Sequence, residues 1–250
     1  MTAAVGTPAL PPDVAEVVAM LATLPGTVAV ALGGSRAAGG ADAGSDWDVA
    51  VYYRGALGLD ALAARGEVHP PGAWGRIMNG GAWLRVGDLV VDVLLRDLDV
   101  VLHWTARAEA GEWELDALLG YAAGLPTYSL AAELASGRVL AGTLPVVGPM
   151  PALLRETAPP RWRFCRDFSL EYARMHAARG NVVGAVAQAA RAAMEEAHAR
   201  ACERGLWTLN EKRLLALTGV AGLDALFAAP PAVGGDWERW LDAVGHALAP

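Results

Sequence analysis

The sequence predicts an α+β protein, in which a small mixed β-sheet with flanking helices is followed by a C-terminal helical bundle. Two observations support this class. Up to about residue 130, short apolar segments typical of strands alternate with glycine-rich and proline-rich loops. From about residue 150, apolar residues recur with helical spacing over long segments. We therefore expect one domain over residues 1–135 and a helical domain over residues 136–250.

In the front half, the alternation of apolar and polar residues predicts the individual elements. Pro25 and Gly26 end the first helix. Mixed sequence follows the last strand up to residue 142, and we expect Asp97 and Asp99 there to be helix-cap or turn residues. The expected elements are a helix at 14–24, strands at 27–32 and 48–53, a short helix at 57–66, a loop at 69–81, and a hairpin of strands 82–86 and 89–95 around Gly87 and Asp88.

The spacing of apolar residues predicts consecutive helices in the back half of the chain. The pair Gly180-Asn181 is a stop signal, and Asn210 is expected to cap a later helix. The stretch "APPR" at 158–161 is interpreted as a joint, because proline breaks the hydrogen-bond ladder of a helix. The expected helices cover 161–179, 182–205, 211–219 and 236–248.

Composition narrows the functional class. The chain has 250 residues, 54% of them hydrophobic, and a formal net charge of −7. Residues 1–130 carry 7 basic and 15 acidic side chains. This balance argues against bulk binding of nucleic acid, which needs a basic face. An acidic front half suits a cationic substrate or metal ions, or is simply a soluble surface.

The compartment is predicted from what the sequence lacks. No apolar run approaches the roughly 18 residues of a membrane span, and the first residues have no basic region typical of a secretory signal. Cys165 and Cys202 are far apart, which suits a reducing compartment. We therefore expect a cytoplasmic protein that has no membrane partner.

The stretch "GGSRAAGGADAGSDWDVAVYY", from Gly33 to Tyr53, carries the chemistry. Glycine lets backbone N–H groups approach an anion, and Ser35 adds a hydroxyl donor. Asp46 and Asp48 are two residues apart, so on a strand both point to one face. Neighbouring carboxylates repel unless a cation lies between them, and their oxygens suit Mg²⁺ shared with a phosphate chain.

A third carboxylate is expected from Asp92 in "LVVDVLLRD". It lies mid-strand among apolar residues, where a charge is costly without a partner. Asp88 fits the hairpin turn instead.

These motifs resemble those of the DNA polymerase β-like nucleotidyltransferase superfamily. That family has an apolar strand, Gly-Gly/Ser, about ten residues, Asp-x-Asp, and a carboxylate on a later strand. Here Arg36 to Ser45 are the ten residues between Ser35 and Asp46. The resemblance covers residues 27–97, and the two-domain layout is similar to stand-alone bacterial members such as aminoglycoside and lincosamide nucleotidyltransferases.

The resemblance implies transfer of a nucleoside monophosphate, AMP if the donor is ATP, to a hydroxyl group with release of pyrophosphate. Gly34 and Ser35 would hold the β- and γ-phosphates. Asp46 and Asp48 would bind two Mg²⁺ ions, and Asp92 would share the catalytic ion or accept the hydroxyl proton.

Residues outside the core motifs are expected to complete the site. Lys212 is the single lysine among 20 basic residues, and in related two-domain members a lysine of the helical domain contacts the triphosphate. Arg191 is a weaker candidate for the same role, since a surface or interhelical ion pair explains it better. Asn79 and Trp83 either shape the acceptor or nucleotide pocket or belong to a structural turn.

Three readings of the acceptor remain open. The first is a small hydroxylated molecule, such as an aminoglycoside-like antibiotic, and it agrees with the two-domain size and acidic front half. The second is a macromolecule, either a protein hydroxyl or a tRNA end, as in toxin–antitoxin transferases. The third is a nucleotide-binding relative without catalysis, against which the complete aspartate set argues.

Overall fold

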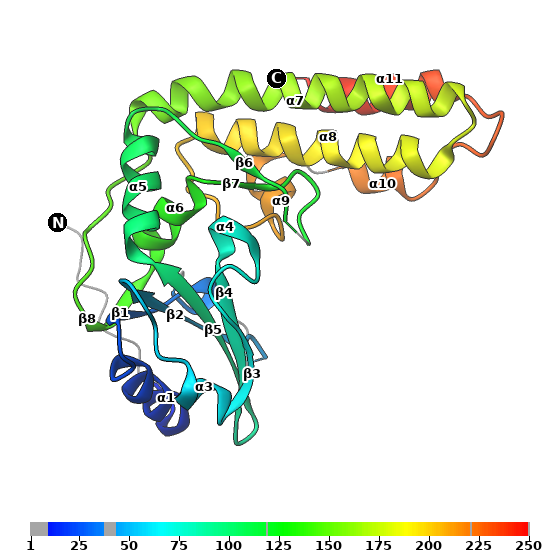
Figure 1. The fold of residues 1–250 in the computed structure, drawn as a ribbon. Coiled ribbons are helices and arrows are strands. Elements are labelled where there is room, and N and C mark those ends of the chain that lie inside the picture. Colours follow the sequence, from blue (N-terminus) through cyan, green and yellow to red (C-terminus); the bar gives the residue numbers. More distant parts are fainter. Residues whose placement is uncertain (1–9, 38–43, 119, 221, 250) are drawn as a thin grey trace. The chain divides into compact units, whose positions relative to one another are not determined.

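The computed structural model describes residues 10–37, 44–118, 120–220 and 222–249 and divides into two compact units (Figure 1). The sheet unit contains residues 1–106 and 130–148, and the helical unit contains residues 107–129 and 149–250. The protein is therefore of mixed α and β class, with the helices concentrated towards the C-terminus. The domain boundary after residue 135 stays a prediction.

The sheet unit is built on a six-stranded mixed sheet of order β3-β4-β5-β2-β1-β8. β2 and β5 are parallel, and the other neighbouring pairs are antiparallel. The six strands are β1 (Thr27–Leu32), β2 (Trp47–Tyr53), β3 (Gly66–His69), β4 (Gly80–Val86), β5 (Leu89–Asp97) and β8 (Arg138–Gly142). β1, β2, β4 and β5 confirm the four strands expected from the sequence.

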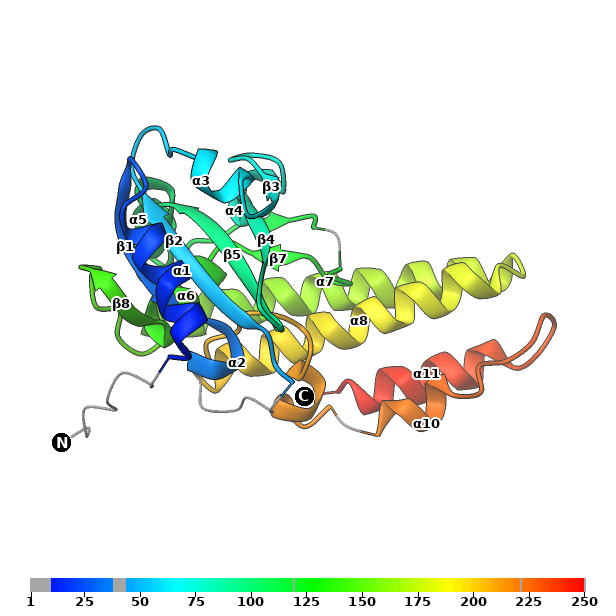
Figure 2. The same cartoon turned by 90° about the horizontal axis from the view of Figure 1, so that it is seen from below.

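One face of this sheet is covered by α1 (Pro12–Ala22), which lies along β1 and β2 (Figure 2). Its buried side chains follow the spacing of one helical stripe: Val14, Val17, Val18 and Leu21. They pack on inward-facing strand residues such as Val30, Val49 and Val93. This hydrophobic core lies between α1 and one face of the sheet, whereas the other face carries Asp48, Asp92 and Arg96 together with buried Ala50 and Tyr52.

A buried ion pair connects the opposite face of the sheet to the helices that pack on it. The Arg96 guanidinium, 1% exposed, binds the Glu133 carboxylate at 2.6 and 2.7 Å and donates to the Met78 carbonyl at 2.7 Å. Glu133 lies on α6 (Ser129–Ser136), and Met78 ends α4 (Gly75–Met78). One side chain of β5 thus ties two helices to this face of the sheet. Nearby, burial raises the pKa of Tyr52 far above its usual value.

Several elements of this unit differ from the expectation. The segment 69–81, predicted as a loop, contains the end of β3 and the short helix α4, and the helix predicted at 57–66 is the single turn α3 (Asp60–Ala63). The mixed sequence up to residue 142 contains α5 (Leu98–Glu109), α6 and β8. Asp97 begins α5 by accepting bonds from the N–H groups of Asp99 and Val100, so its predicted cap role is confirmed.

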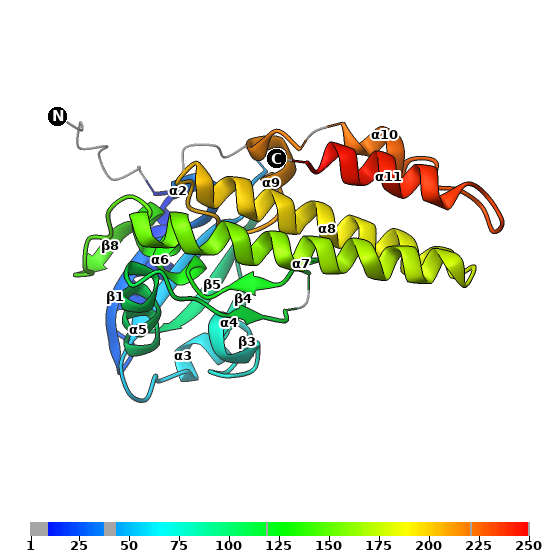
Figure 3. The ribbon, with the colours of Figure 1, turned by 90° about the horizontal axis from the view of Figure 1, so that it is seen from above.

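The helical unit is dominated by two long helices, α7 (Ala152–Ala178) and α8 (Val182–Glu203), which run side by side (Figure 3). Asn181, in the predicted stop, caps α8 by accepting a bond from the Gly184 N–H. No helix in the described ranges is long and apolar enough to cross a membrane. The remaining elements are α9 (Leu214–Thr218), α10 (Leu223–Phe227), α11 (Trp237–Ala247) and the short strands β6 (Leu115–Asp116) and β7 (Leu125–Pro126).

Two predictions for this unit are wrong. α7 continues through Pro159 and Pro160, where a joint was expected. Buried contacts on both sides of the prolines, at Leu154, Ala158 and Trp162, offset the two lost backbone hydrogen bonds. Asn210 accepts a bond from the Lys212 N–H, but α9 begins only at Leu214, so Asn210 forms a turn and does not cap that helix.

A stack of three rings forms part of the core of the helical unit. Trp162 lies between Trp113, with ring centroids 4.8 Å apart, and His198, with centroids 4.4 Å apart. Both ring nitrogens of His198 are buried without a hydrogen-bond partner, and Nε2 is 3.9 Å from Glu211 Oε1. Burial lowers the pKa of His198, and the Glu211 carboxylate offsets part of that effect.

We predict that His198→Phe stabilises the helical unit by about 1 kcal/mol at pH 7, because phenylalanine keeps the stack and removes two unsatisfied polar atoms. The pKa of His198 is lower in the folded protein than in the unfolded chain. Below about pH 6.5 the unfolded chain therefore binds more protons than the folded one, and the free energy of unfolding of the wild type decreases as the pH is lowered. The advantage of the variant should therefore grow from pH 7 to pH 5, measured by urea unfolding. His246→Phe, on an exposed position of α11, is the control. A variant less stable than wild type at pH 7 would contradict the prediction.

Candidate active site

Asp48 and Asp92 are adjacent across the parallel pair β2 and β5, where they occupy the same register position. Neighbouring in-register residues point to one face of a sheet, so both carboxylates belong to the face opposite α1. Both residues are half-buried, and their sequence neighbours Trp47, Val91 and Val93 point into the core. The alternation of the two strands therefore brings two acidic side chains together.

The glycine-rich segment lies directly against Asp48. The Gly33 N–H donates to the Asp48 carbonyl at 2.8 Å, which extends the pairing of β1 and β2 by one residue. Gly34 has φ +59°, and a Cβ there would lie 1.8 Å from Asp48 Oδ2. No other residue fits at Gly34 while Asp48 keeps this position. Ser35 follows, exposed, within the single turn α2 (Gly34–Ala37).

Arg36 connects the start of the glycine-rich segment to its end, a role that the sequence pattern did not predict. Its guanidinium stacks 4.2 Å above the Trp47 ring and donates to the carbonyl groups of Ser45 and Asp46. Residues 38–43 lie outside the described ranges, but their two flanks are joined by this one side chain. Arg36 therefore fixes where the chain enters β2, immediately before Asp48.

Asp46 is exposed and precedes β2, two residues before Asp48. Within the described residues, no group of three or more His, Cys, Asp or Glu side chains is arranged to hold a metal ion. The structure thus brings Asp48 and Asp92 together, whereas participation of Asp46 stays a prediction. The carboxylates of Asp48 and Asp92, beside a glycine position that admits no side chain, are hard oxygen donors of the kind that Mg²⁺ prefers.

Trp83 lies next to Asp92, whereas Asn79 precedes β4 at one end of the strand pair, where Gly80 is opposite Leu95. Trp83 of β4 is the register neighbour of Asp92, and 46% of its surface is exposed. Asn79 has φ +64°; its Nδ2 donates to the Tyr53 hydroxyl at 2.7 Å, and its Oδ1 accepts from the Gly72 N–H. These bonds give Asn79 a structural role in its loop. A contact of either residue with substrate stays a prediction.

The two predicted phosphate contacts of the back half, Lys212 and Arg191, belong to the helical unit. Lys212 is exposed. Arg191 Nε donates to Glu195 Oε1 at 2.9 Å within α8, so part of its hydrogen-bonding capacity is used inside the helix. Burial raises the pKa of Glu195, and its pairing with Arg191 opposes that rise.

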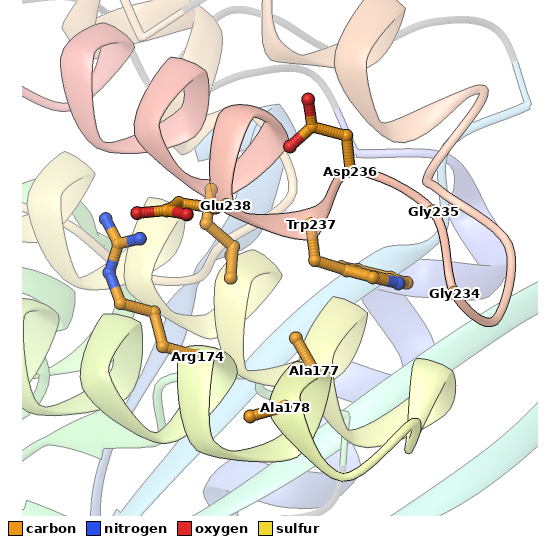
Figure 4. A pocket seen from close by; sticks show the side chains of 9 residues that line it. Arg174, Ala177, Ala178, Gly234, Gly235, Asp236, Trp237 and Glu238 are labelled. Carbon is orange, nitrogen blue, oxygen red and sulfur yellow. The ribbon is translucent and has the colours of Figure 1, made fainter.

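An open hollow of about 520 Å³ lies in the helical unit, between the end of α7 and the start of α11 (Figure 4). Three of its polar side chains already have structural roles. Arg174 pairs with Asp242, Asp236 caps α11, and the Trp237 indole donates to the Ala232 carbonyl. None of the residues predicted from the sequence lines this hollow.

No family model and no curated protein matches the chain. Among solved structures, it is similar to a nucleotidyltransferase-like protein from Exiguobacterium sibiricum 255-15, with 13% sequence identity and a TM-score of 0.45. The match covers 94% of this chain and 73% of that one.

We predict that Gly34→Ala lowers the free energy of unfolding by about 1 to 3 kcal/mol, because its Cβ would overlap the Asp48 carboxylate at a positive φ. Adding Asp48→Ala removes the overlapping atoms and should restore part of the loss. Urea unfolding of the two single variants and the double variant measures this coupling. Gly44→Ala is the control, since a Cβ there meets nothing within 4 Å. Additive effects of the two substitutions would refute the contact.

Proposed function

We propose that this chain is a Mg²⁺-dependent nucleotidyltransferase that moves a nucleoside monophosphate, AMP from ATP, to a hydroxyl group of a small molecule and releases pyrophosphate. The observation that carries the proposal is the in-register pair Asp48 and Asp92, with Gly34 pressed against the Asp48 carboxylate. Two carboxylates beside the Gly33-Gly34 segment suit a metal-bound phosphate chain.

In this proposal, Gly34 and Ser35 face the β- and γ-phosphates with backbone and hydroxyl donors. Asp48 and Asp92 would hold Mg²⁺, with Asp46 as a further ligand. When bound, Mg²⁺ would neutralise charge on the phosphates and on the attacking and leaving oxygens. Asp92 would also orient the acceptor hydroxyl and accept its proton. Arg36 acts indirectly, because it holds the backbone that leads into Asp48.

A small acceptor is favoured over RNA by charge. Residues 1–130 carry 7 basic and 15 acidic side chains, which repel a polyanion. The same field would attract a cationic hydroxylated compound, and an aminoglycoside-like molecule is the concrete candidate.

The direct test is a labelling screen with Mg²⁺, each α-³²P-labelled NTP, and panels of aminoglycosides, tRNA and cell lysate. Label on a small molecule supports the proposal, and label on tRNA or protein would replace the acceptor with a macromolecule. Failure of every NTP to bind in the presence of Mg²⁺ would refute an enzyme of this class.

We expect Asp48→Asn to lower the transfer rate about 10³-fold or more, since a metal ligand contributes several kcal/mol to the transition state. The fold should persist, because asparagine has nearly the same shape. Asp88→Asn, at the exposed hairpin turn, is the matched control and should retain activity. The measurement is the initial rate of label transfer, with circular dichroism as the check on folding. Normal turnover by Asp48→Asn would show that the metal assignment is wrong.

A separate prediction concerns Lys212. If its ammonium contacts the triphosphate, Lys212→Ala should raise the KM for the NTP about tenfold, and Lys212→Arg should restore only part of the loss. Arg213→Ala changes an exposed neighbouring charge and is the control. An unchanged KM in Lys212→Ala would remove this residue from the site.

A further inference from the structure

Three aromatic rings form a cluster next to Asp92 on the same face of the sheet. The Trp83 ring centroid lies 4.6 Å from that of His69 and 5.6 Å from that of Trp74. His69 meets Trp83 edge-on and lies 5.0 Å from Trp74. Because these contacts support Trp83, its ring has a defined position on the sheet, although 46% of its surface remains exposed.

The chain makes room for this cluster at Gly81. A Cβ on Gly81 would lie 2.3 Å from a ring carbon of Trp74, so only glycine lets that ring rest on β4. Glu67, on β3 like His69, lies beside the cluster, with its Oε1 3.4 Å from Nε2 of His69. Gly81 thus makes room for the Trp74 ring, and Trp74 in turn supports the exposed Trp83.

The order of the strands determines on which side of the two carboxylates each substrate would bind. A single row across the sheet runs from Gly33 through Asp48, Asp92 and Trp83 to Glu67. The glycine segment lies on one side of the two carboxylates, and Trp83 lies on the other. Neighbouring strands are about 4.8 Å apart, so a group on Trp83 is one strand spacing from Asp92.

We propose that Trp83 is a stacking platform for the acceptor, which therefore carries a ring, either a sugar or an aromatic ring, next to the reacting hydroxyl. This inference rests on the proposed function, which places the donor phosphates at the glycine segment. A ring stacked on Trp83 brings its hydroxyl beside Asp92, opposite the phosphates. The platform selects a flat ring face and gives no comparable contact to an open-chain alcohol.

The test is saturation-transfer NMR on the full chain with three probes: methyl β-D-glucoside, phenyl β-D-glucoside and glycerol. We expect transfer to the ring protons of one or both glucosides and none to glycerol. Trp83→Ala should reduce the transfer about tenfold, whereas Trp83→Phe should retain it. Val139→Ala, an exposed apolar position on β8, is the matched control and should behave as wild type.

Repeating the measurement with Mg²⁺ and α,β-methylene-ATP separates acceptor from donor. Glucoside transfer that persists in the ternary mixture supports an acceptor platform. Displacement by the nucleotide would overturn it, because Trp83 would then hold the nucleobase. Equal transfer in wild type and Trp83→Ala, or no transfer to either glucoside, would also overturn it.

Failure of the proposed function has a different signature. In that case the Mg²⁺–nucleotide complex does not bind, while the Trp83-dependent transfer to the glucoside is unaffected. Nucleotide binding without glucoside transfer, in contrast, removes the platform and leaves the nucleotidyltransferase proposal intact.

Discussion

The parallel pairing of β2 with β5 is the constraint on which the candidate site depends. It places Asp48 and Asp92 in register, and the same alternation sends Val49 and Val93 into the core under α1. A slip of one residue would turn one carboxylate into that core and bring its apolar neighbours to the polar face. Burial of the valines therefore fixes the face on which the aspartates lie, because a slip of one residue would expose the valines.

Two glycines complete the arrangement on either side of this pair. At Gly34 the missing side chain leaves space for the Asp48 carboxylate, and at Gly81 it leaves space for the Trp74 ring. Glycine loses more entropy on folding than other residues, and at Gly81 it also leaves β4 without a side chain to pack. In both places the space is filled by another side chain, the Asp48 carboxylate at Gly34 and the Trp74 ring at Gly81, so each glycine permits one close contact beside the candidate site.

The sequence predicted the central strands because strand alternation is a local pattern. It also indicated Asp92 as a third carboxylate, but the register that places Asp92 beside Asp48 depends on the parallel pairing of β2 with β5, which it did not predict. It did not predict α5, α6 or β8, whose segments depend on distant partners such as the bond between Arg96 and Glu133. The continuous α7 was missed for the same reason, since packing around Trp162 overrides the preference of two prolines. Arg36 was missed because its partners are backbone carbonyl groups, which leave no trace in residue spacing.

Two carboxylates at directly opposed positions of neighbouring strands are unfavourable on electrostatic grounds, and half-burial strengthens their repulsion. The sheet could avoid this cost with Asn or Thr at either position and keep the same hydrophobic core. Both acids lie in one row across the sheet with Gly33 on one side and the exposed Trp83 on the other. In the proposed function, a cation shared with a phosphate chain would lie against these two carboxylates and offset the repulsion between them.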